Sequence, residues 1–311
     1  MKQVIRLLIA LAFAHASLGQ HAPKVELAHE KFSHFLNLRD FCISKNNDEI
    51  YFTAQSPSQE ISQILYMKKV KGKWSEPELM PFSNVYSDLE PFLSYDQNTL
   101  YFASNRPTTA ASESKKDFDI WFVNRQNKNV DWSKPQNMGA PVNSENNEFY
   151  PSLSKNNNLY FTSDATTATT KDDIYFCTYE NGRYQSPKPL GATINSTGYE
   201  FNAFISPNED FLLFTKYNSE DGLGSGDLYI SYSDKQGNWG AAKNLGIPVN
   251  TKFMEYCPFY DETNETLYFT SRRDNLVAKK FNNVTDFNHY ISGSENGLSK
   301  IYAIRLKLPT P

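Results

Sequence analysis

The sequence predicts an all-β protein built as a single closed β-propeller of five four-stranded blades, with six blades as the alternative. Three observations predict this fold. A similar segment recurs five times along the 311 residues, strand-forming residues are frequent with 14% aromatics, and no long amphipathic helical pattern appears. Self-similarity at a period of roughly 50–60 residues is typical of repeat architectures, and short strands separated by turn residues indicate an all-β fold.

Each repeat begins with an inner strand, and four of the five are headed by an acidic residue. The inner strands start at Asp88, Glu148, Glu200 and Glu255, while the first copy, which starts near Leu38, is degenerate. A turn rich in Asn, Asp and Lys leads to a second strand of the Leu-Tyr-Phe-Thr-Ser type. A third strand of the Asp-Ile-Tyr type follows. Four copies then add an aromatic-led segment such as Trp74-Ser75-Glu76-Pro77, which we interpret as the outer edge strand because such strands tolerate proline.

The fifth repeat lacks the aromatic-led segment, since the sequence ends soon after its third strand. The stretch Lys24-Val25-Glu26-Leu27 precedes the first repeat and has the character of a short strand. We expect this N-terminal strand to complete the last blade and so close the ring, which removes an open sheet edge.

The Glu-x-x-Pro-x-x-Ser start, the Leu-Tyr-Phe-Thr-Ser strand and the Asp-Ile-Tyr strand resemble the TolB-type, WD-like propeller repeat of bacterial envelope proteins. The resemblance covers roughly residues 36–305. It implies a propeller fold, although that family commonly has six or more blades. It is weak for function, because such propellers include scaffolds, binding modules and domains of enzymes.

The first 19 residues have the pattern of a cleaved signal peptide, with Lys2 and Arg6 ahead of a short apolar run and small residues after it. We therefore expect residues 20–311 to form one exported propeller domain, periplasmic or secreted, without a transmembrane span and monomeric. The net charge of −4, with both signs mixed, argues against a nucleic-acid partner. A Cys42–Cys257 disulfide stays open, although buried free thiols are favoured.

Two sets of residues should meet on the face where the inner strands start. One set is the repeat-start acids Asp88, Glu148, Glu200 and Glu255, with Asp40 and Glu90 two positions further on. The other follows the second strands and comprises Arg106, Asp164, Lys216, Arg272 and Arg273. Repetition favours a structural role for the acids. The alternative is a carboxylate ring that holds a cation or an amine, or works as acid and base. No cofactor is expected, and a cation at the channel mouth stays open.

The loops between second and third strands are the least repetitive segments and thus the preferred binding elements. They span residues 107–118, 165–172, 217–226 and 274–299, and the last carries His289 and Tyr290. We expect a non-catalytic module that recognises an envelope protein, a peptide or a glycan. The alternative is a glycan-active hydrolase or lyase that uses Glu148, Glu200, Glu255 or Asp88. A Gly-x-Ser-x-Gly elbow is absent, and the few histidines do not suggest a metal site.

Overall fold

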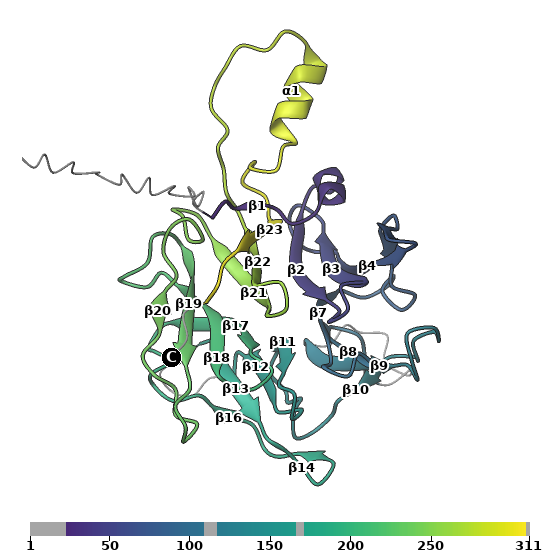
Figure 1. The fold of residues 1–311 in the computed structure, drawn as a ribbon, viewed down its shortest axis with the longest axis vertical. Coiled ribbons are helices and arrows are strands. Elements are labelled where there is room, and N and C mark those ends of the chain that lie inside the picture. Colours follow the sequence, from purple (N-terminus) through teal and green to yellow (C-terminus); the bar gives the residue numbers. More distant parts are fainter. Residues whose placement is uncertain (1–22, 109–116, 166–170, 309–311) are drawn as a thin grey trace, which may run out of the picture.

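The computed structural model describes residues 23–108, 117–165 and 171–308, and in these residues the protein is a five-bladed β-propeller (Figure 1). This confirms the predicted fold class and five blades rather than six. The expected signal peptide at residues 1–19 lies outside the described residues. No helix in the described part of the chain is long and apolar enough to span a membrane.

Each blade is a small antiparallel sheet whose strands follow one another from the channel outward. Blade 1 contains β2 (Leu38–Ile43), β3 (Glu49–Gln55), β4 (Ser62–Val70), β5 (Lys73–Trp74) and β6 (Glu78–Leu79). Blade 2 contains β7 (Asp88–Leu93), β8 (Thr99–Ser104), β9 (Asp119–Asn124) and β10 (Gln136–Asn137). Blade 3 contains β11 (Glu148–Leu153), β12 (Leu159–Ser163), β13 (Asp173–Cys177) and β16 (Lys188–Pro189), with a side hairpin of β14 (Tyr179–Glu180) and β15 (Arg183–Tyr184). Blade 4 contains β17 (Tyr199–Ile205), β18 (Phe211–Tyr217), β19 (Gly226–Tyr232) and β20 (Lys243–Asn244).

The fifth blade joins the two ends of the chain, as predicted. It contains β21 (Glu255–Asp261), β22 (Thr266–Ser271) and β23 (Lys300–Arg305). Its outer strand is β1 (Glu26–Leu27), which pairs antiparallel with β23 through Glu26 opposite Ala303. The 3-10 helix η1 (Glu30–His34) follows β1, and its buried Phe32 packs into the core of blade 1. The N-terminal segment thereby bridges the last and first blades.

The second strands pack the blades against one another because their side chains alternate between the two faces. Tyr51 and Phe52 are both fully buried, but Tyr51 faces the core shared with blade 2, while Phe52 faces the core that contains Phe32. The aromatic residue before each outer strand packs in the same way. Trp132 of blade 2 contacts Tyr51 of blade 1, with ring centroids 6.3 Å apart.

Every inner strand carries a β-bulge at the third residue counted from the repeat start, which is Leu38, Asp88, Glu148, Glu200 or Glu255. The five residues there have positive φ angles of 52–61°, although none is glycine; they are Asp40, Glu90, Tyr150, Asn202 and Cys257. Left-handed backbone at non-glycine residues costs free energy and persists only where the surroundings enforce it. Such bulges also re-aim side chains and interrupt strand pairing.

The bulge turns the backbone N–H of the third residue toward the preceding blade. In three blades this N–H reaches a threonine hydroxyl on the neighbouring second strand; the pairs are Asp40–Thr270 (3.1 Å), Glu90–Thr53 (3.2 Å) and Asn202–Thr162 (3.0 Å). Blade 2 has Ala103 at the threonine position and lacks this hydroxyl. There the Tyr150 N–H donates to the carboxylate of Glu90 instead, at 2.7 Å. These bonds link blade 5 to blade 1, blade 1 to blade 2, blade 2 to blade 3 and blade 3 to blade 4.

The insertion between β22 and β23 forms an arm that extends away from the ring (Figure 1). It carries α1 (Val284–Ile291), which has no buried residue. The arm is held by its own side chains, because Phe281 packs on Phe287 and Tyr290 and the Lys279 ammonium lies 3.6 Å from the Tyr290 ring centroid. His289 and Tyr290 thus lie on the arm and away from the channel.

Candidate functional site

The repeat-start acids are buried and serve the backbone of the blade connections. Glu148, Glu200 and Glu255 each accept two hydrogen bonds from the residue four positions earlier, one from its N–H and one from its hydroxyl. The donors are Ser144 (3.2 and 2.5 Å), Ser196 (2.8 and 2.5 Å) and Thr251 (2.8 and 2.8 Å). A glutamate at this place therefore caps the turn that enters its own inner strand, whichever blade carries it.

Three of the four repeat-start acids also have a basic partner from their own blade. Arg106 contacts Asp88 at 2.5 Å, Lys216 lies 3.8 Å from Glu200, and Arg273 lies 3.7 Å from Glu255. The Arg106 guanidinium is enclosed by four aromatic rings, and Arg273 stacks over two. The contacts of these predicted site residues thus lie within the blades and not in the channel.

Glu148 is the repeat-start acid that has no basic partner among the described residues. Where blades 2 and 5 place Arg106 and Arg273, blade 3 has Ala165, and Asp164 caps the N–H of Asn147 at 2.8 Å. Burial raises the pKa of Glu148 to about 7, against the lowering effect of its bonds to Ser144.

We expect the pKa of Glu148 to make the protein less stable as the pH rises. A carboxyl whose folded pKa exceeds its unfolded value of about 4.5 stabilises the fold fully below that value, and this contribution is lost as the pH passes 7. The Glu148→Gln variant should gain up to about 3 kcal/mol relative to wild type between pH 4.5 and 8. Urea unfolding across this range measures the difference. The exposed neighbour variant Glu145→Gln is the matched control, and a pH-independent difference for E148Q would contradict the expectation.

The channel opens on the face where the inner strands start into a cavity of about 230 Å³, which we call the polar mouth. The second residues of the inner strands line it; they are Arg39, Leu89, Phe149, Phe201 and Tyr256. Glu90 and Asn202 from the bulges reach it as well, together with Gln59, Thr162, Asp172, Met254 and Arg272. None of the four repeat-start acids contributes to this lining.

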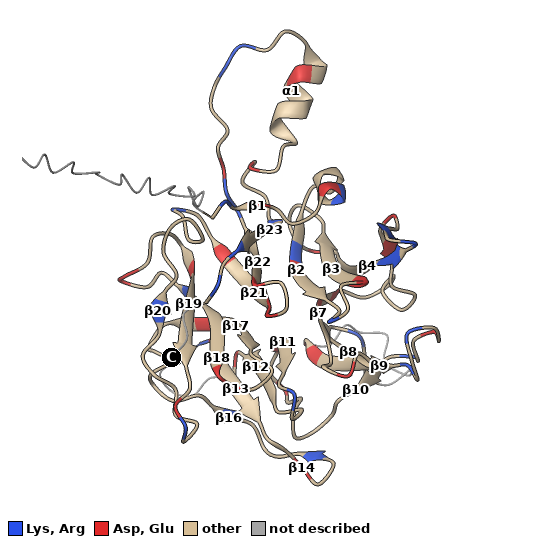
Figure 2. Cartoon of the chain, in the orientation of Figure 1, with Lys and Arg blue, Asp and Glu red and all other residues tan. Residues whose placement is uncertain are grey.

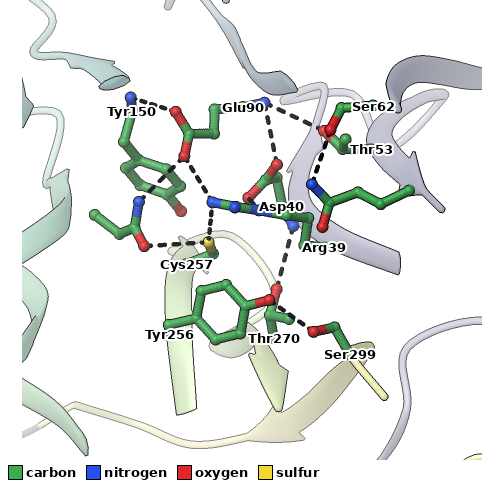
Figure 3. A network of polar contacts seen from close by, with 12 residues as sticks. Arg39, Asp40, Thr53, Ser62, Glu90, Tyr150, Tyr256, Cys257, Thr270 and Ser299 are labelled. Carbon is green, nitrogen blue, oxygen red and sulfur yellow. Dashed lines mark hydrogen bonds and ion pairs between the residues drawn. The ribbon is translucent and has the colours of Figure 1, made fainter. Parts of the chain in front are cut away.

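The polar mouth has a network of charged and polar groups at its base (Figure 3). Arg39 donates through Nε to Asp40 at 2.9 Å and through Nη2 to Glu90 at 2.6 Å. The same Nη2 lies 3.3 Å from the Cys257 sulfur, and the guanidinium lies 5.2 Å from the Tyr256 ring centroid. Arg39 thus connects blades 1, 2 and 5.

Glu90 is the carboxylate whose protonation is most altered in the polar mouth. Burial raises its pKa to about 7, while Arg39 lowers it and Asp40 raises it. Its Oε1 accepts from Arg39 and, at 3.4 Å, from Asn202, and its Oε2 accepts from the Tyr150 N–H. Both carboxylate oxygens are therefore occupied by the protein itself.

The bulge corrects the sequence expectation that Asp40 and Glu90 lie beside the repeat-start acids. Because one extra residue is inserted, simple alternation fails, and their side chains join the network at the channel while position 1 faces the blade connections. Arg39, Asn202 and Tyr256 were missed from sequence. In the sequence these residues differ from the other copies at the second or third position of the repeat. For Arg39 this difference was hidden because the whole first copy is degenerate.

The predicted loops contribute unequally to the polar mouth. Residues 109–116 and 166–170 of two loops lie outside the described residues. The long loop reaches the groove beside the mouth only at its base, through Asp274 and Gly297. Its aromatic and basic residues, including the predicted site residues His289 and Tyr290, are on the arm. Most of the predicted binding loop 274–299 therefore lies on the arm, and its base borders the groove beside the mouth.

The opposite end of the channel has a smaller cavity of about 130 Å³, lined by Phe92, Phe204 and Phe259 together with Lys45, Asp261 and Glu262. Within the channel, the Tyr150 hydroxyl donates to the Pro258 carbonyl at 2.9 Å. Acidic and basic residues are interspersed over the blades (Figure 2). Both ends of the channel therefore carry charged groups, and the polar mouth is the end at which Arg39 and Glu90 form a buried ion pair.

The cysteines and acids of the described residues do not assemble a metal site. Cys42, Cys177 and Cys257 are buried free thiols, so Cys42 and Cys257 are not paired. No group of three or more His, Cys, Asp or Glu side chains is placed to bind a metal ion within the described ranges.

Comparisons with known proteins find similarity in structure only. No family model matches the sequence, and no curated protein matches it. TolB from Acinetobacter baumannii is 13% identical with a TM-score of 0.49, covering 86% of this chain and 54% of TolB, so the chain spans about half of that protein. The α-L-arabinofuranosidase PaAbf62A from Podospora anserina is 9% identical with a TM-score of 0.51, covering 87% and 90%. Zg3597, a family 117 glycoside hydrolase from Zobellia galactanivorans, is 13% identical with a TM-score of 0.50, covering 91% and 90%.

These similarities show the propeller fold. The five-bladed propeller predicted from the repeat is confirmed by the structure itself, and TolB structures are among the matches, at TM-scores of 0.49 and 0.48. At identities this low, activity and partners do not follow from the matches.

Proposed function

We propose that this protein is an exported, non-catalytic propeller that binds its ligand at the polar mouth. One observation carries the proposal: the repeat is uniform where residues build the blades and variable where they line the mouth. The repeat-start position is acidic in four blades, but the third position differs in all five, and the second position repeats only in Phe149 and Phe201. A binding site needs such asymmetry, because identical residues around a ring create identical environments.

The geometry favours binding over catalysis. Glycosidic hydrolysis requires two carboxyl groups that face the substrate at a defined separation. Glu148, Glu200 and Glu255 are buried as turn caps, Asp88 is buried against Arg106, and Glu90 has both oxygens engaged with protein donors. The signal-peptide pattern supports export, and the ligand classes that suit the cell envelope are a protein, a peptide or a glycan.

Two phenylalanines that line the polar mouth, Phe149 and Phe201, provide the test of this proposal. Phe149 and Phe201 are half-buried at the polar mouth, so their loss should remove contact area without opening the core. We expect the F149A/F201A variant to lose at least ten-fold in retention of envelope proteins and glycans on the immobilised mature protein. A thermal melt confirms that the variant folds.

The matched control removes two aromatic side chains elsewhere. Tyr95 and Tyr179 are each 37% exposed and are not part of the polar mouth. Y95A/Y179A should retain the same ligands as wild type. If F149A/F201A retains them equally well, the polar mouth is not the binding site.

A glycan-active enzyme is the second candidate, favoured by the carboxylates of Asp40 and Glu90. Both contact Arg39, and the pKa of Glu90 is raised to about 7, as a general acid requires. Incubation of envelope polysaccharides with wild type and Glu90→Gln separates the two functions. New reducing ends with wild type that vanish in E90Q would establish the enzyme, whereas intact, bound polysaccharide supports the binding module.

A further inference from the structure

The strongest departure from the repeat at the polar mouth is Arg272. The equivalent residues of blades 2 and 3 are Asn105 and Asp164, whose side-chain oxygens accept the N–H of the residue before the repeat-start acid, at 3.0 and 2.8 Å. In blade 5 the backbone follows the same course, since the Arg272 N–H bonds to the Met254 carbonyl. An arginine side chain has only donors, so it cannot serve as this cap.

The guanidinium of Arg272 is held by Ser299 and Tyr256 but makes few other contacts with protein groups. Its Nε donates to Ser299 at 3.3 Å, and its plane lies 5.8 Å from the Tyr256 ring centroid. No acidic side chain of the described residues forms an ion pair with it, in contrast to Arg39, Arg106 and Arg273. The terminal N–H groups of Arg272 are thus available on the wall of the polar mouth, where Arg39 is a second cation.

Arg272 also connects the polar mouth to a neighbouring groove of about 410 Å³. The two cavities share Met254 and Arg272, and the groove adds Lys252, Phe253 and Tyr217. The Lys252 ammonium lies 5.0 Å from the Phe253 ring centroid. The exposed ammonium of Lys252 therefore lies beside the Phe253 ring, in the groove that Arg272 also lines.

We propose, on the basis of binding at the polar mouth, that the ligand is an acidic oligosaccharide whose carboxylates are bound by Arg272 and Lys252. A planar guanidinium matches a carboxylate in a bidentate geometry. The aromatic rings offer flat faces for sugar rings. Asp172 and Gln59 supply an acceptor and an amide for hydroxyl groups.

An acidic peptide suits the same cavity less well. Its carboxylates would match Arg272, but it has few hydroxyl groups to donate to Asp172. A uronic acid ring carries both a carboxylate and several hydroxyls, so it complements the mixed lining.

The test is a calorimetric titration of tetragalacturonate into the full mature protein. Hydrogen bonds to charged groups contribute about 1.5–3 kcal/mol, so Arg272→Gln should weaken binding by about 10- to 100-fold. Lys252→Gln should have a smaller effect in the same direction. Arg305→Gln is the matched control, because Arg305 is exposed at the far end of β23 and its loss changes the charge equally. Binding should also weaken as NaCl is raised.

Two further probes decide the chemical class. The methyl-esterified tetramer keeps the sugar rings but lacks the charge, and hexaglutamate keeps the charge without the rings. Preferential binding of tetragalacturonate that depends on Arg272 supports the inference. Equal binding of the ester would overturn the carboxylate site, and Arg272-dependent binding of hexaglutamate alone would overturn the glycan class.

The failure of this inference is distinguishable from failure of the proposed function. If no probe binds, but envelope ligands are retained by wild type and lost from F149A/F201A, the acidic glycan is wrong and the mouth is still the binding site. If retention is also unaffected in F149A/F201A, both are wrong.

Discussion

The Arg39→Met variant is expected to lose about 3–5 kcal/mol in free energy of unfolding at pH 7, because it leaves two buried carboxylates without their cation. Arg39 contacts Asp40 and Glu90, whose side chains are only 1% and 3% exposed. Methionine keeps much of the side-chain volume, so the loss reports mainly on the charge. Urea denaturation of the full mature protein measures it.

The pH dependence separates the loss of charge from a loss of packing. Without Arg39 the pKa of Glu90 should rise further, because burial already raises it and Arg39 opposes that rise. The destabilisation in R39M should therefore be smaller at pH 5 than at pH 8. Arg305→Met is the control for an exposed arginine and should change stability by less than about 0.5 kcal/mol. A loss below about 1 kcal/mol in R39M would show that the network does not hold the blades together.

Glu90→Ala is expected to lose about 2–4 kcal/mol, and a second substitution should restore part of it. Glu90 accepts the Tyr150 N–H because blade 2 has Ala103 where three other blades place the threonine that accepts this bond. Alanine at position 90 leaves that buried N–H without an acceptor, which costs about 1–3 kcal/mol. It also removes the partner of Arg39.

The compensating substitution is Ala103→Thr. By analogy with Thr53, Thr162 and Thr270, its hydroxyl should accept the Tyr150 N–H, so E90A/A103T should regain about 1 kcal/mol over E90A. In the wild-type background the same change should gain little, because the N–H is already bonded. A double-mutant cycle gives the coupling. If A103T changes the free energy of unfolding equally in both backgrounds, the Glu90 carboxylate does not take the place of the missing threonine hydroxyl as acceptor of the Tyr150 N–H.

The double variant also bears on the choice between binding and catalysis. If Glu90 is only a connector between blades, E90A/A103T should bind ligand nearly as well as wild type. If it acts on a glycan, the restored fold would remain inactive.

The repeat made the architecture predictable from sequence. The Leu-Tyr-Phe-Thr-Ser strands and the acidic starts recur at positions that every blade needs, and the short strand near Glu26 had one obvious place in the ring. The roles of Glu148, Glu200 and Glu255 depended on Ser144, Ser196 and Thr251, which lie four residues earlier in irregular segments. The hydrogen bonds from these residues to the glutamates depend on the geometry of the turn, so the alternation of residues along a strand could not predict them.

The polar mouth was harder to predict, because the bulge changes which side chains face the channel. Strict alternation groups Glu90 with Asp88, whereas the left-handed backbone at Glu90 turns its side chain toward Arg39. Arg272 was a candidate from its place after the second strand. Arg272 stands out because Asn105 and Asp164 cap a backbone N–H at the equivalent position and an arginine cannot. This equivalence becomes visible only when the strand registers of the three blades are aligned.

Hydrogen–deuterium exchange with and without tetragalacturonate tests the central claim most directly, because it locates the ligand on the ring. We predict slower exchange in peptides that cover residues 251–257 and 272–276, with no change at residues 92–98 and 259–265 around the opposite end of the channel. Arg272→Gln should abolish the effect, and Arg305→Gln should preserve it. Protection at the opposite end or on the arm, with none at the polar mouth, would contradict the account.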